Sequence, residues 1–402
     1  MAKKKLTICF VTQEYPEETG WGGIGTYTFE MAHGLARLGH RVFVVSRALQ
    51  DQQIYQEQDG VTVYRILPRL SFDKCRVFWR LNRLWEGYHL AVALLLRKLI
   101  CKYDIDIIET PTLNGETVFF QYWKRHFPLV VRIHSCVIKE MALGKARDRI
   151  FLRINRFYER RATMLAKGVS APSNAIARDN FSYLPIQKKD IKIIANPIDS
   201  QGAIANYQKD IGQESTVLFV GRFDQLKGAH ILARAMPLVW EHCPDVCFLF
   251  VGKDGKAPDD GIMSKWILSQ ASSDRKSQVR FKTHISRDKL IKIYHQATIV
   301  AVPSFSEAFG YVCVEAMLAG VPVVASRIGS LQEFIENGKT GMLIKPGDPE
   351  SLARAIVDLL GNRQLRENIT RVAKDKVSKH YSPEVICKQM VNFYQSVIDK
   401  NK

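Results

Sequence analysis

The chain has 402 residues, and because single domains mostly hold about 50 to 250 residues, two domains are expected. With 46% hydrophobic and 24% charged residues, its composition is that of a soluble globular protein and excludes disordered and fibrous classes. The longest apolar run, residues 90–96, is far shorter than the roughly 20 residues of a membrane-spanning helix.

The net charge is +18, from 58 basic and 40 acidic residues. Residues 1–200 hold 31 of the basic and 19 of the acidic residues, so most of the excess lies in the first half. Such an excess favours polyanionic partners, namely nucleic acid, an anionic lipid surface or phosphorylated small molecules. The eight cysteines are scattered without zinc-site spacing, and no secretory signal is recognised, so we expect free thiols in a reducing cytoplasm.

Short apolar runs alternate with amphipathic stretches along the whole chain. In the first half they predict a helix at residues 27–38 and strands at residues 6–11, 41–46, 61–66, 105–109, 129–134, 168–171 and 191–194. After Pro197 the alternation restarts, with strands at residues 216–220, 246–251, 279–281, 298–303, 322–325 and 340–344 and helices at residues 226–242, 287–296, 311–319 and 349–360.

Two successive strand–helix series predict an α/β protein with two doubly wound, Rossmann-like domains. We expect these domains at residues 1–198 and 199–380, with residues 195–208 as the linker. Ligands of such sheets bind beyond the C-terminal ends of the strands. The functional residues are therefore expected there, facing a cleft between the domains.

The strongest motif is SFSEAFGYVCVEAM, residues 304–317, which follows a predicted strand and opens a helix. Glu307 and the free amides of Phe309 and Gly310 suit hydroxyl or phosphate oxygens. Glu315, farther along the helix, can accept both hydroxyls of a vicinal diol such as ribose. The alternative makes Glu307 a helix-start acid favoured by the dipole and Glu315 a solvated residue. The apolar neighbours of Glu315 argue against that alternative.

The second motif is VGRFDQLKG, residues 220–228, which also leads from a strand into a helix. Arg222 offers a planar fork for bidentate phosphate contact, and Lys227 a mobile point charge. Basic residues at a helix start have the wrong sign for the helix dipole, so their presence indicates an anion. The alternative is that these basic side chains lie at an exposed turn and contact only solvent.

Three segments in the first half of the chain hold weaker candidate residues. Tyr15, Gly22 and Gly23 follow the first strand, in either a phosphate- or sugar-binding loop or a plain flexible one. His134 ends a predicted buried strand, where it either faces the cleft or is a satisfied core residue. Glu109 and Thr110 end another strand and, together with Tyr15, are weaker acceptor-side candidates.

Two further patterns concern metals and membranes. Asp104 and Asp106 match a D-x-D metal motif but stand at the start of a strand, the wrong end for a site, so no metal ligand is assigned. Residues 65–102 hold nine basic residues with interleaved aromatics and suit an anionic membrane interface, or else core-facing aromatics with a solvated basic face. The basic run 145–161 supports a surface patch.

Together these motifs resemble the retaining nucleotide-sugar glycosyltransferases of family 4, which have the GT-B fold. The resemblance covers nearly the whole chain and is most specific from Glu307 to Glu315. One departure lies at residues 329–333, where Gly-Ser-Leu-Gln-Glu replaces the common Gly-Gly-x-Pro-Glu. The resemblance also implies that the last helix, about residues 381–402, packs back on the first domain.

The resemblance implies roles for the matching residues. Glu307 would contact the donor sugar with the amides of Phe309 and Gly310, and Glu315 would hold the ribose. Arg222 and Lys227 would neutralise the diphosphate in place of a metal, so no cofactor is expected. Gly22 and Gly23 would approach the donor phosphate or the acceptor, and His134 would face the transferred sugar.

The resulting hypothesis is a hexosyltransferase, either free in the cytoplasm or at the inner membrane face, that moves a sugar from a nucleoside diphosphate to a glycan or lipid-linked acceptor. A nucleotide-sugar epimerase of the same fold is one alternative. A basic nucleic-acid-binding protein is another, but it gives Glu307 and Glu315 no task.

Overall fold

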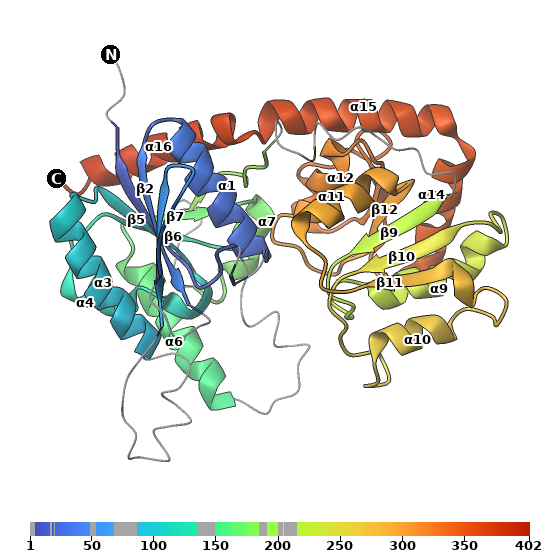
Figure 1. Ribbon diagram of the computed structural model, residues 1–402, viewed down its shortest axis with the longest axis horizontal. Coiled ribbons are helices and arrows are strands. Elements are labelled where there is room, and N and C mark those ends of the chain that lie inside the picture. Colours follow the sequence, from blue (N-terminus) through green and yellow to red (C-terminus); the bar gives the residue numbers. More distant parts are fainter. Residues whose placement is uncertain are drawn as a thin grey trace. The chain divides into compact units, whose positions relative to one another are not determined.

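The computed structural model describes residues 5–16, 18–19, 21–48, 54–67, 87–134, 149–184, 191–199, 204 and 215–402. The chain divides into two compact units (Figure 1). Unit 1 comprises Met1–Pro197 and Pro383–Lys402, and unit 2 comprises Ile198–Ser382. None of the described helices is both long and apolar enough to cross a membrane.

Unit 1 is built on an eight-stranded sheet in the order β3-β4-β2-β1-β5-β6-β7-β8. Neighbouring strands are parallel except for the hairpin of β3 and β4. Its turn, Asp59-Gly60, has the positive φ angles that such a two-residue turn requires. The strands are β1 Thr7–Val11, β2 Arg41–Arg47, β3 Ile54–Gln58, β4 Val61–Ile66, β5 Ile107–Pro111, β6 Leu129–Arg132, β7 Gly168–Ala171 and β8 Ile191–Ile193.

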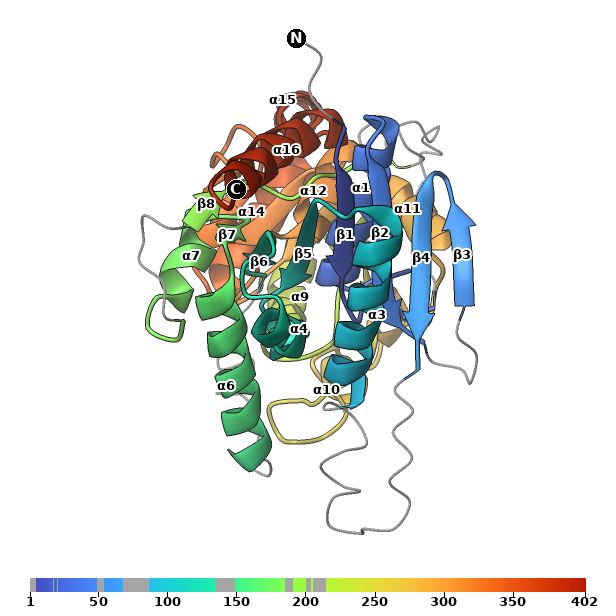
Figure 2. The same cartoon turned by 90° about the vertical axis from the view of Figure 1, so that its left-hand side faces the viewer.

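The helices of unit 1 connect these strands, and they include the last helix of the chain. They are α1 Gly23–Arg37, α3 Gly87–Tyr103, α4 Val118–Trp123, α6 Arg149–Leu165, α7 Asn174–Asn180 and α16 Pro383–Asp399. Figure 2 shows α3, α4 and α6 side by side, with α4 packed between the other two. Helix α1 begins four residues before the predicted start at residue 27, so Gly23 is helical.

Unit 2 contains a six-stranded parallel sheet in the order β11-β10-β9-β12-β13-β14. The strands are β9 Thr216–Val220, β10 Cys247–Val251, β11 Val279–Lys282, β12 Ile299–Val302, β13 Val323–Ser326 and β14 Met342–Ile344. The helices are α9 Ala229–Trp240, α10 Met263–Ser269, α11 Arg287–Gln296, α12 Tyr311–Leu318, α13 Gly329–Gln332, α14 Pro349–Gly361 and α15 Arg363–His380.

Each sheet has one point where its strand order reverses. In unit 2 the chain builds outward from β9 to β11 and then returns to place β12 on the other side of β9. In unit 1 the corresponding reversal separates β1 from β5. Loops that leave adjacent parallel strands at such a point diverge around a crevice, where doubly wound folds bind ligands. Within unit 2 the loops after β9 and β12 therefore lie together, and within unit 1 the loops after β1 and β5 do.

Helix α16 is held on unit 1 by a buried hydrogen-bonded group. Tyr394 on α16 donates a hydrogen bond of 2.8 Å to one carboxyl oxygen of Glu109 in β5, and Tyr27 on α1 donates one of 2.6 Å to the other. All three side chains are buried. Burial raises the pKa of Glu109, while Arg132 and the two tyrosines oppose the shift. Glu109 thus ties the last helix to the first and to the sheet.

Removing one of these hydrogen bonds should lower the stability of unit 1. We expect Tyr394→Phe to reduce the free energy of unfolding by about 1–3 kcal/mol, the cost of leaving a buried acceptor unpaired. Urea denaturation followed by circular dichroism measures it. Tyr122→Phe, at an exposed tyrosine, is the matched control and should unfold as the wild type does. Equal stability of all three proteins would contradict the tethering role.

Candidate functional site

The strand-order reversal of unit 2 brings together two of the predicted site residues. Lys227 lies between β9 and α9, and Glu307 lies between β12 and α12. Lys227 Nζ is 2.8 Å from Glu307 Oε1, and the two side chains are 28% and 12% exposed. Ser304 Oγ donates a second hydrogen bond of 2.8 Å to the same oxygen. The cation and the carboxylate therefore form a partly shielded pair that a ligand can still reach.

The loop that carries Glu307 is fixed from two sides. Ser330 Oγ, at the start of α13, donates a 2.6 Å hydrogen bond to the Glu307 carbonyl. Gly310 has φ 89°, and a Cβ atom there would lie 2.4 Å from Leu331 Cδ2, so the position requires glycine. Phe309 is buried against Phe334, so its backbone, rather than its ring, is available to a ligand. Helix α12 then begins with no side-chain cap.

Arg222 forms an ion pair with Asp224, a residue of the same motif that was not among the predicted site residues. Its Nε is 2.9 Å from Asp224 Oδ2, and the Arg222 side chain is 57% exposed. The other Asp224 oxygen accepts a 2.8 Å hydrogen bond from the Lys227 amide. Asp224 thus shapes the turn before α9 and links both cations. Within the described part of the chain, Arg222 forms its ion pair with Asp224, whereas Glu307 forms one with Lys227.

A glycine permits the close approach of the β9 and β12 loops. Gly228 caps α9 with φ 74°, and a Cβ atom there would lie 2.0 Å from the Pro303 carbonyl oxygen. Any other residue would push the start of α9 away from the end of β12. The glycine after Lys227 is therefore needed for the Lys227–Glu307 contact, a constraint that the motif alone does not reveal.

Glu315 lies in a separate buried polar group on α12. Its Oε1 accepts a 2.8 Å hydrogen bond from Arg287, and its Oε2 accepts one of 2.8 Å from the Tyr294 hydroxyl. Burial first, and Glu315 second, raise the pKa of Tyr294 well above 10, so the hydroxyl remains a donor. Arg287 and Tyr294 were not predicted. Their seven-residue spacing places both on one face of α11, which is the signal that the sequence offers.

In unit 1, Gly22 and Gly23 form the N-terminus of α1. Gly22 is the N-cap, both glycines are exposed, and no side chain caps the helix. A Cβ atom on Gly22 would lie 2.3 Å from Glu14 Oε2, whereas one on Gly23 would meet nothing within 4 Å. The predicted glycine loop is thus a helix start, where uncapped amides and the helix dipole favour an anionic or hydroxyl oxygen.

His134 follows β6 by two residues and is buried beside Tyr27, with 4.7 Å between the ring centroids. Burial first, and then Arg132, hold the pKa of His134 well below its ordinary value. The imidazole is therefore neutral at pH 7. Neutral imidazole can accept and donate hydrogen bonds but carries no charge to neutralise a phosphate.

The three acceptor-side candidates are all buried, so none of them presents an exposed polar group to a ligand. Tyr15 is fully buried and packs against Phe29, with 6.0 Å between ring centroids. Glu109 is engaged by the two tyrosines described above, and Thr110 is 1% exposed. The reason is that every residue of β5 is buried, so a polar residue in this strand does not reach the surface. The structure explains Glu109 as a tethering group instead of an acceptor contact.

A different polar group stands at the reversal point of unit 1 and was missed. The Gln13 amide, after β1, donates a 3.2 Å hydrogen bond to Glu116 Oε1, after β5. Gln13 Nε2, Glu116 Oε2 and the Tyr88 hydroxyl are buried and have no hydrogen-bond partner within the part of the chain that is described. Burial first, then the Glu14 charge, raises the pKa of Glu116 to about 8. Buried without a partner, these atoms leave hydrogen-bonding capacity unused at this point of unit 1, as do the Tyr15 hydroxyl and Thr110 Oγ1.

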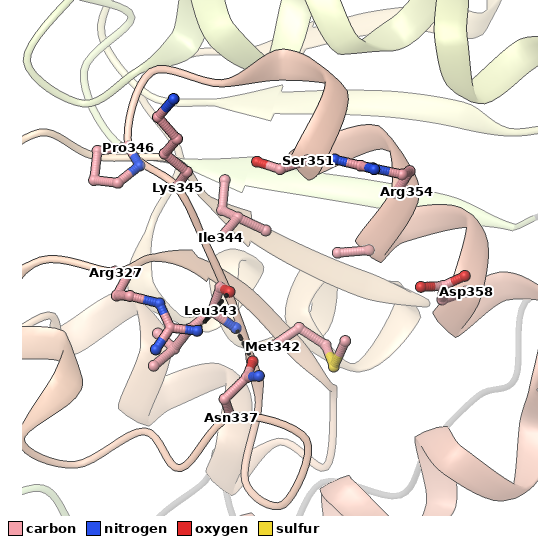
Figure 3. Close-up of a pocket in the computed structure, with 11 residues that line it drawn as sticks. Arg327, Asn337, Met342, Leu343, Ile344, Lys345, Pro346, Ser351, Arg354 and Asp358 are labelled. Atoms are coloured by element: carbon pink, nitrogen blue, oxygen red, sulfur yellow. Dashed lines mark hydrogen bonds between the residues drawn. The ribbon is translucent and has the colours of Figure 1, made fainter.

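The structure also has a shallow hollow of about 420 Å³ in unit 2, beside the edge strand β14 (Figure 3). Arg327 and Asn337 point at the backbone of this strand, with Asn337 Oδ1 2.7 Å from the Leu343 amide and Arg327 Nη2 3.5 Å from its carbonyl. These contacts cover the free edge, which protects a sheet against pairing with another chain. None of the predicted site residues lines the hollow.

Replacing Glu116 with glutamine should remove a loss of unfolding free energy that we expect in the wild type as the pH rises. Between the ordinary pKa of 4.5 and about 8, the unfolded carboxyl has lost its proton while the folded one keeps it. The wild type should therefore lose about 1.4 kcal/mol of unfolding free energy per pH unit in this window, and Glu116→Gln should not. Urea denaturation at several pH values measures the difference. Glu241→Gln, at an exposed position, is the control, and parallel profiles for all three proteins would contradict the assignment.

The chain matches known families over most of its length. Residues 21–201 match the model of Glycosyltransferase Family 4, and residues 205–376 match that of Glycosyl transferases group 1. The chain is 35% identical to a D-inositol 3-phosphate glycosyltransferase of Corynebacterium urealyticum, over 94% of this chain and 91% of that protein. It is 26% identical to a phosphatidyl-myo-inositol mannosyltransferase of Mycobacterium leprae, over 94% and 93%.

Solved structures of low sequence identity confirm the predicted GT-B fold. A sucrose-phosphate synthase of Thermosynechococcus elongatus superposes with a TM-score of 0.77 at 21% identity, covering 98% of this chain and 100% of that one. HepE of Anabaena, solved with UDP-glucose, gives a TM-score of 0.72 at 21% identity, covering 97% and 99%. The motifs, the two sheets and these matches together establish that the chain belongs to glycosyltransferase family 4 and is a glycosyltransferase.

Proposed function

We propose that the protein transfers a hexose from a nucleoside-diphosphate sugar to a hydroxyl of a glycan or lipid-linked acceptor, with retention of anomeric configuration and without an obligatory metal. The observation that carries the proposal is the contact between Lys227 and Glu307 where the strand order of unit 2 reverses. A cation and a carboxylate there match the two parts of the donor, its diphosphate and its sugar hydroxyls.

Breaking the anomeric bond places negative charge on the departing diphosphate, and fixed cations and helix-start amides can stabilise that charge. Arg222, Lys227 and the uncapped start of α12 supply such groups. When the diphosphate binds, Lys227 exchanges the Glu307 carboxylate for a phosphate oxygen. Glu307 is then free to accept hydrogen bonds from the sugar. The Anabaena relative of similar fold was solved with UDP and with UDP-glucose, which supports a donor of this class.

The proposed transfer needs no enzymic nucleophile. The bond between the anomeric carbon and the phosphate oxygen breaks, and its electron pair stays on the diphosphate. The acceptor oxygen bonds the anomeric carbon on the same face, and its proton passes to the departing phosphate. This same-face course is what the family resemblance implies. In unit 1 we assign ligand contacts to the amides at Gly22 and Gly23 and to the neutral His134.

Lys227→Ala should lower kcat/KM by about 10²–10³-fold, because it removes charge stabilisation of the leaving group. Arg222→Ala should cost less, because Arg222 is the more exposed cation. The assay offers UDP-, GDP- and ADP-sugars in EDTA and follows nucleotide release and sugar transfer. Lys379→Ala, at an exposed lysine, is the control. Full kcat/KM in both site variants, or activity that depends on added divalent metal, would overturn the cation assignment.

The same assay distinguishes the alternative of a nucleotide-sugar epimerase. An epimerase would transfer no sugar to an acceptor.

Tyr294→Phe should weaken recognition of the ribose, because Glu315 loses the hydroxyl that orients it. The test compares the Kd of the bound nucleoside diphosphate with that of its 2′-deoxy form. We expect the preference for the ribose form to fall about threefold or more, corresponding to the loss of one hydrogen bond. Tyr122→Phe should keep the wild-type preference. An unchanged ratio in Tyr294→Phe would remove Glu315 from the ribose site.

A further inference from the structure

Unit 1 exposes large apolar side chains on three neighbouring helices only, as far as its described residues go. Leu94 lies on α3, Tyr122 and Trp123 end α4, and Phe157 and Met164 lie on α6. Each is between 38% and 55% exposed. The three helices lie side by side in Figure 2, and α4 packs against both others. Apolar side chains that gather on one face of a unit indicate a surface that a partner covers.

The exposed charged side chains described on α3, α4 and α6 are all basic. Helices α3 and α4 contain no acidic residue, and the only acid of α6, Glu159, is 3% exposed and bonds the Asn114 amide. The exposed cations on the three helices and the turn after α4 are Arg97, Lys98, Lys102, Lys124, Arg125, Arg153, Arg156 and Arg161. The partner must therefore be anionic as well as apolar.

Helix α6 is amphipathic, and its exposed side combines arginines with two large apolar residues. Its buried face carries polar residues, and Asn155, Glu159 and Thr163 are each 3% exposed. Its outer face carries Phe157 and Met164, seven residues apart and therefore two turns along one stripe. Arg161 lies between them, with its guanidinium 5.4 Å from the Phe157 ring. Surface helices normally bury their apolar stripe, so this stripe is suited to a non-aqueous partner.

We propose that the outer face of α3, α4 and α6 docks unit 1 on an anionic lipid surface. The cations contact lipid phosphates, while Trp123, Phe157 and Met164 enter the boundary between headgroups and acyl chains. A nucleic acid fits less well, because Leu94 and Met164 have no aromatic ring to stack on bases. The proposed transfer does not itself require this surface. Docking on lipid favours a lipid-linked acceptor over a free glycan as the acceptor of the proposed transfer.

The location differs from the one expected from sequence. Of the basic and aromatic segment 65–102, residues 68–86 lie outside the described residues, and the described end is α3. Of the basic run 145–161, residues 145–148 also lie outside them, and the remainder is α6. Trp123, Lys124 and Arg125 were not part of either segment. Trp123 ends the short helix α4, and Lys124 and Arg125 follow it. Only the packing of α4 between α3 and α6 joins the two segments into one surface.

The experiment measures binding of the full-length protein to sucrose-loaded vesicles by sedimentation, without any donor. Wild-type protein should bind phosphatidylcholine vesicles that contain phosphatidylglycerol at low salt, bind pure phosphatidylcholine weakly and dissociate at high salt. The charge variant Arg153→Gln/Arg156→Gln/Arg161→Gln should bind about tenfold more weakly or worse. Its control, Arg363→Gln/Lys379→Gln/Lys388→Gln, removes three exposed cations elsewhere and should bind as the wild type does.

A second pair of variants tests the apolar contribution. Phe157→Ser/Met164→Ser should lower vesicle binding severalfold, whereas Ile262→Ser/Val372→Ser, which removes exposed apolar groups of unit 2, should not. Thermal melting by circular dichroism checks that each variant is folded. Absence of wild-type binding to anionic vesicles, equal losses in the control variants, or salt-sensitive binding to DNA with none to vesicles would each overturn the proposal. Because no donor is present, these outcomes leave the assignment of Lys227 and Glu307 unaffected.

Discussion

The adjacency of β9 and β12 is the constraint on which the candidate site depends. Two segments about eighty residues apart meet because the chain reverses its strand order between them. Lys227 and Glu307 then lie 2.8 Å apart, and Gly228 allows the approach. In the proposed mechanism the ion pair is more than a stabilising contact, because each member exchanges the other for part of the donor. A binding site whose charges are balanced without ligand avoids the cost of an isolated, partly buried cation.

The two units use the same topology for different chemistry. At the reversal point of unit 2, Lys227 and Glu307 are charged and paired with each other, and the proposed diphosphate contact uses the cation. At that of unit 1, Glu116 and its neighbours are buried and uncharged or unpaired, and the glycine-rich start of α1 contributes backbone amides. The buried Glu109 meanwhile joins α1, β5 and α16, so the end of the chain stabilises the unit in which it began.

Sequence patterns predicted the strands other than β3 and the loops that carry Lys227 and Glu307, because those signals are local. A strand followed by Glu307 or Arg222 and a helix start can be read from spacing. Partners supplied by other segments could not be read in this way, and Ser330, Arg287 and Tyr294 were missed for that reason. Glu109 was misplaced because position at a strand end does not reveal that both faces of β5 are covered. The start of α1 was missed because glycine is a poor helix former, and only the fold makes Gly23 helical.

The most direct test of the central claim is calorimetric. In EDTA, the binding free energy of the preferred nucleoside diphosphate minus that of its nucleoside isolates what the phosphates contribute. If Lys227 holds the diphosphate, this difference should shrink markedly in Lys227→Ala, while nucleoside binding stays at the wild-type level. The same difference in both proteins would show that the diphosphate binds elsewhere and would contradict the account.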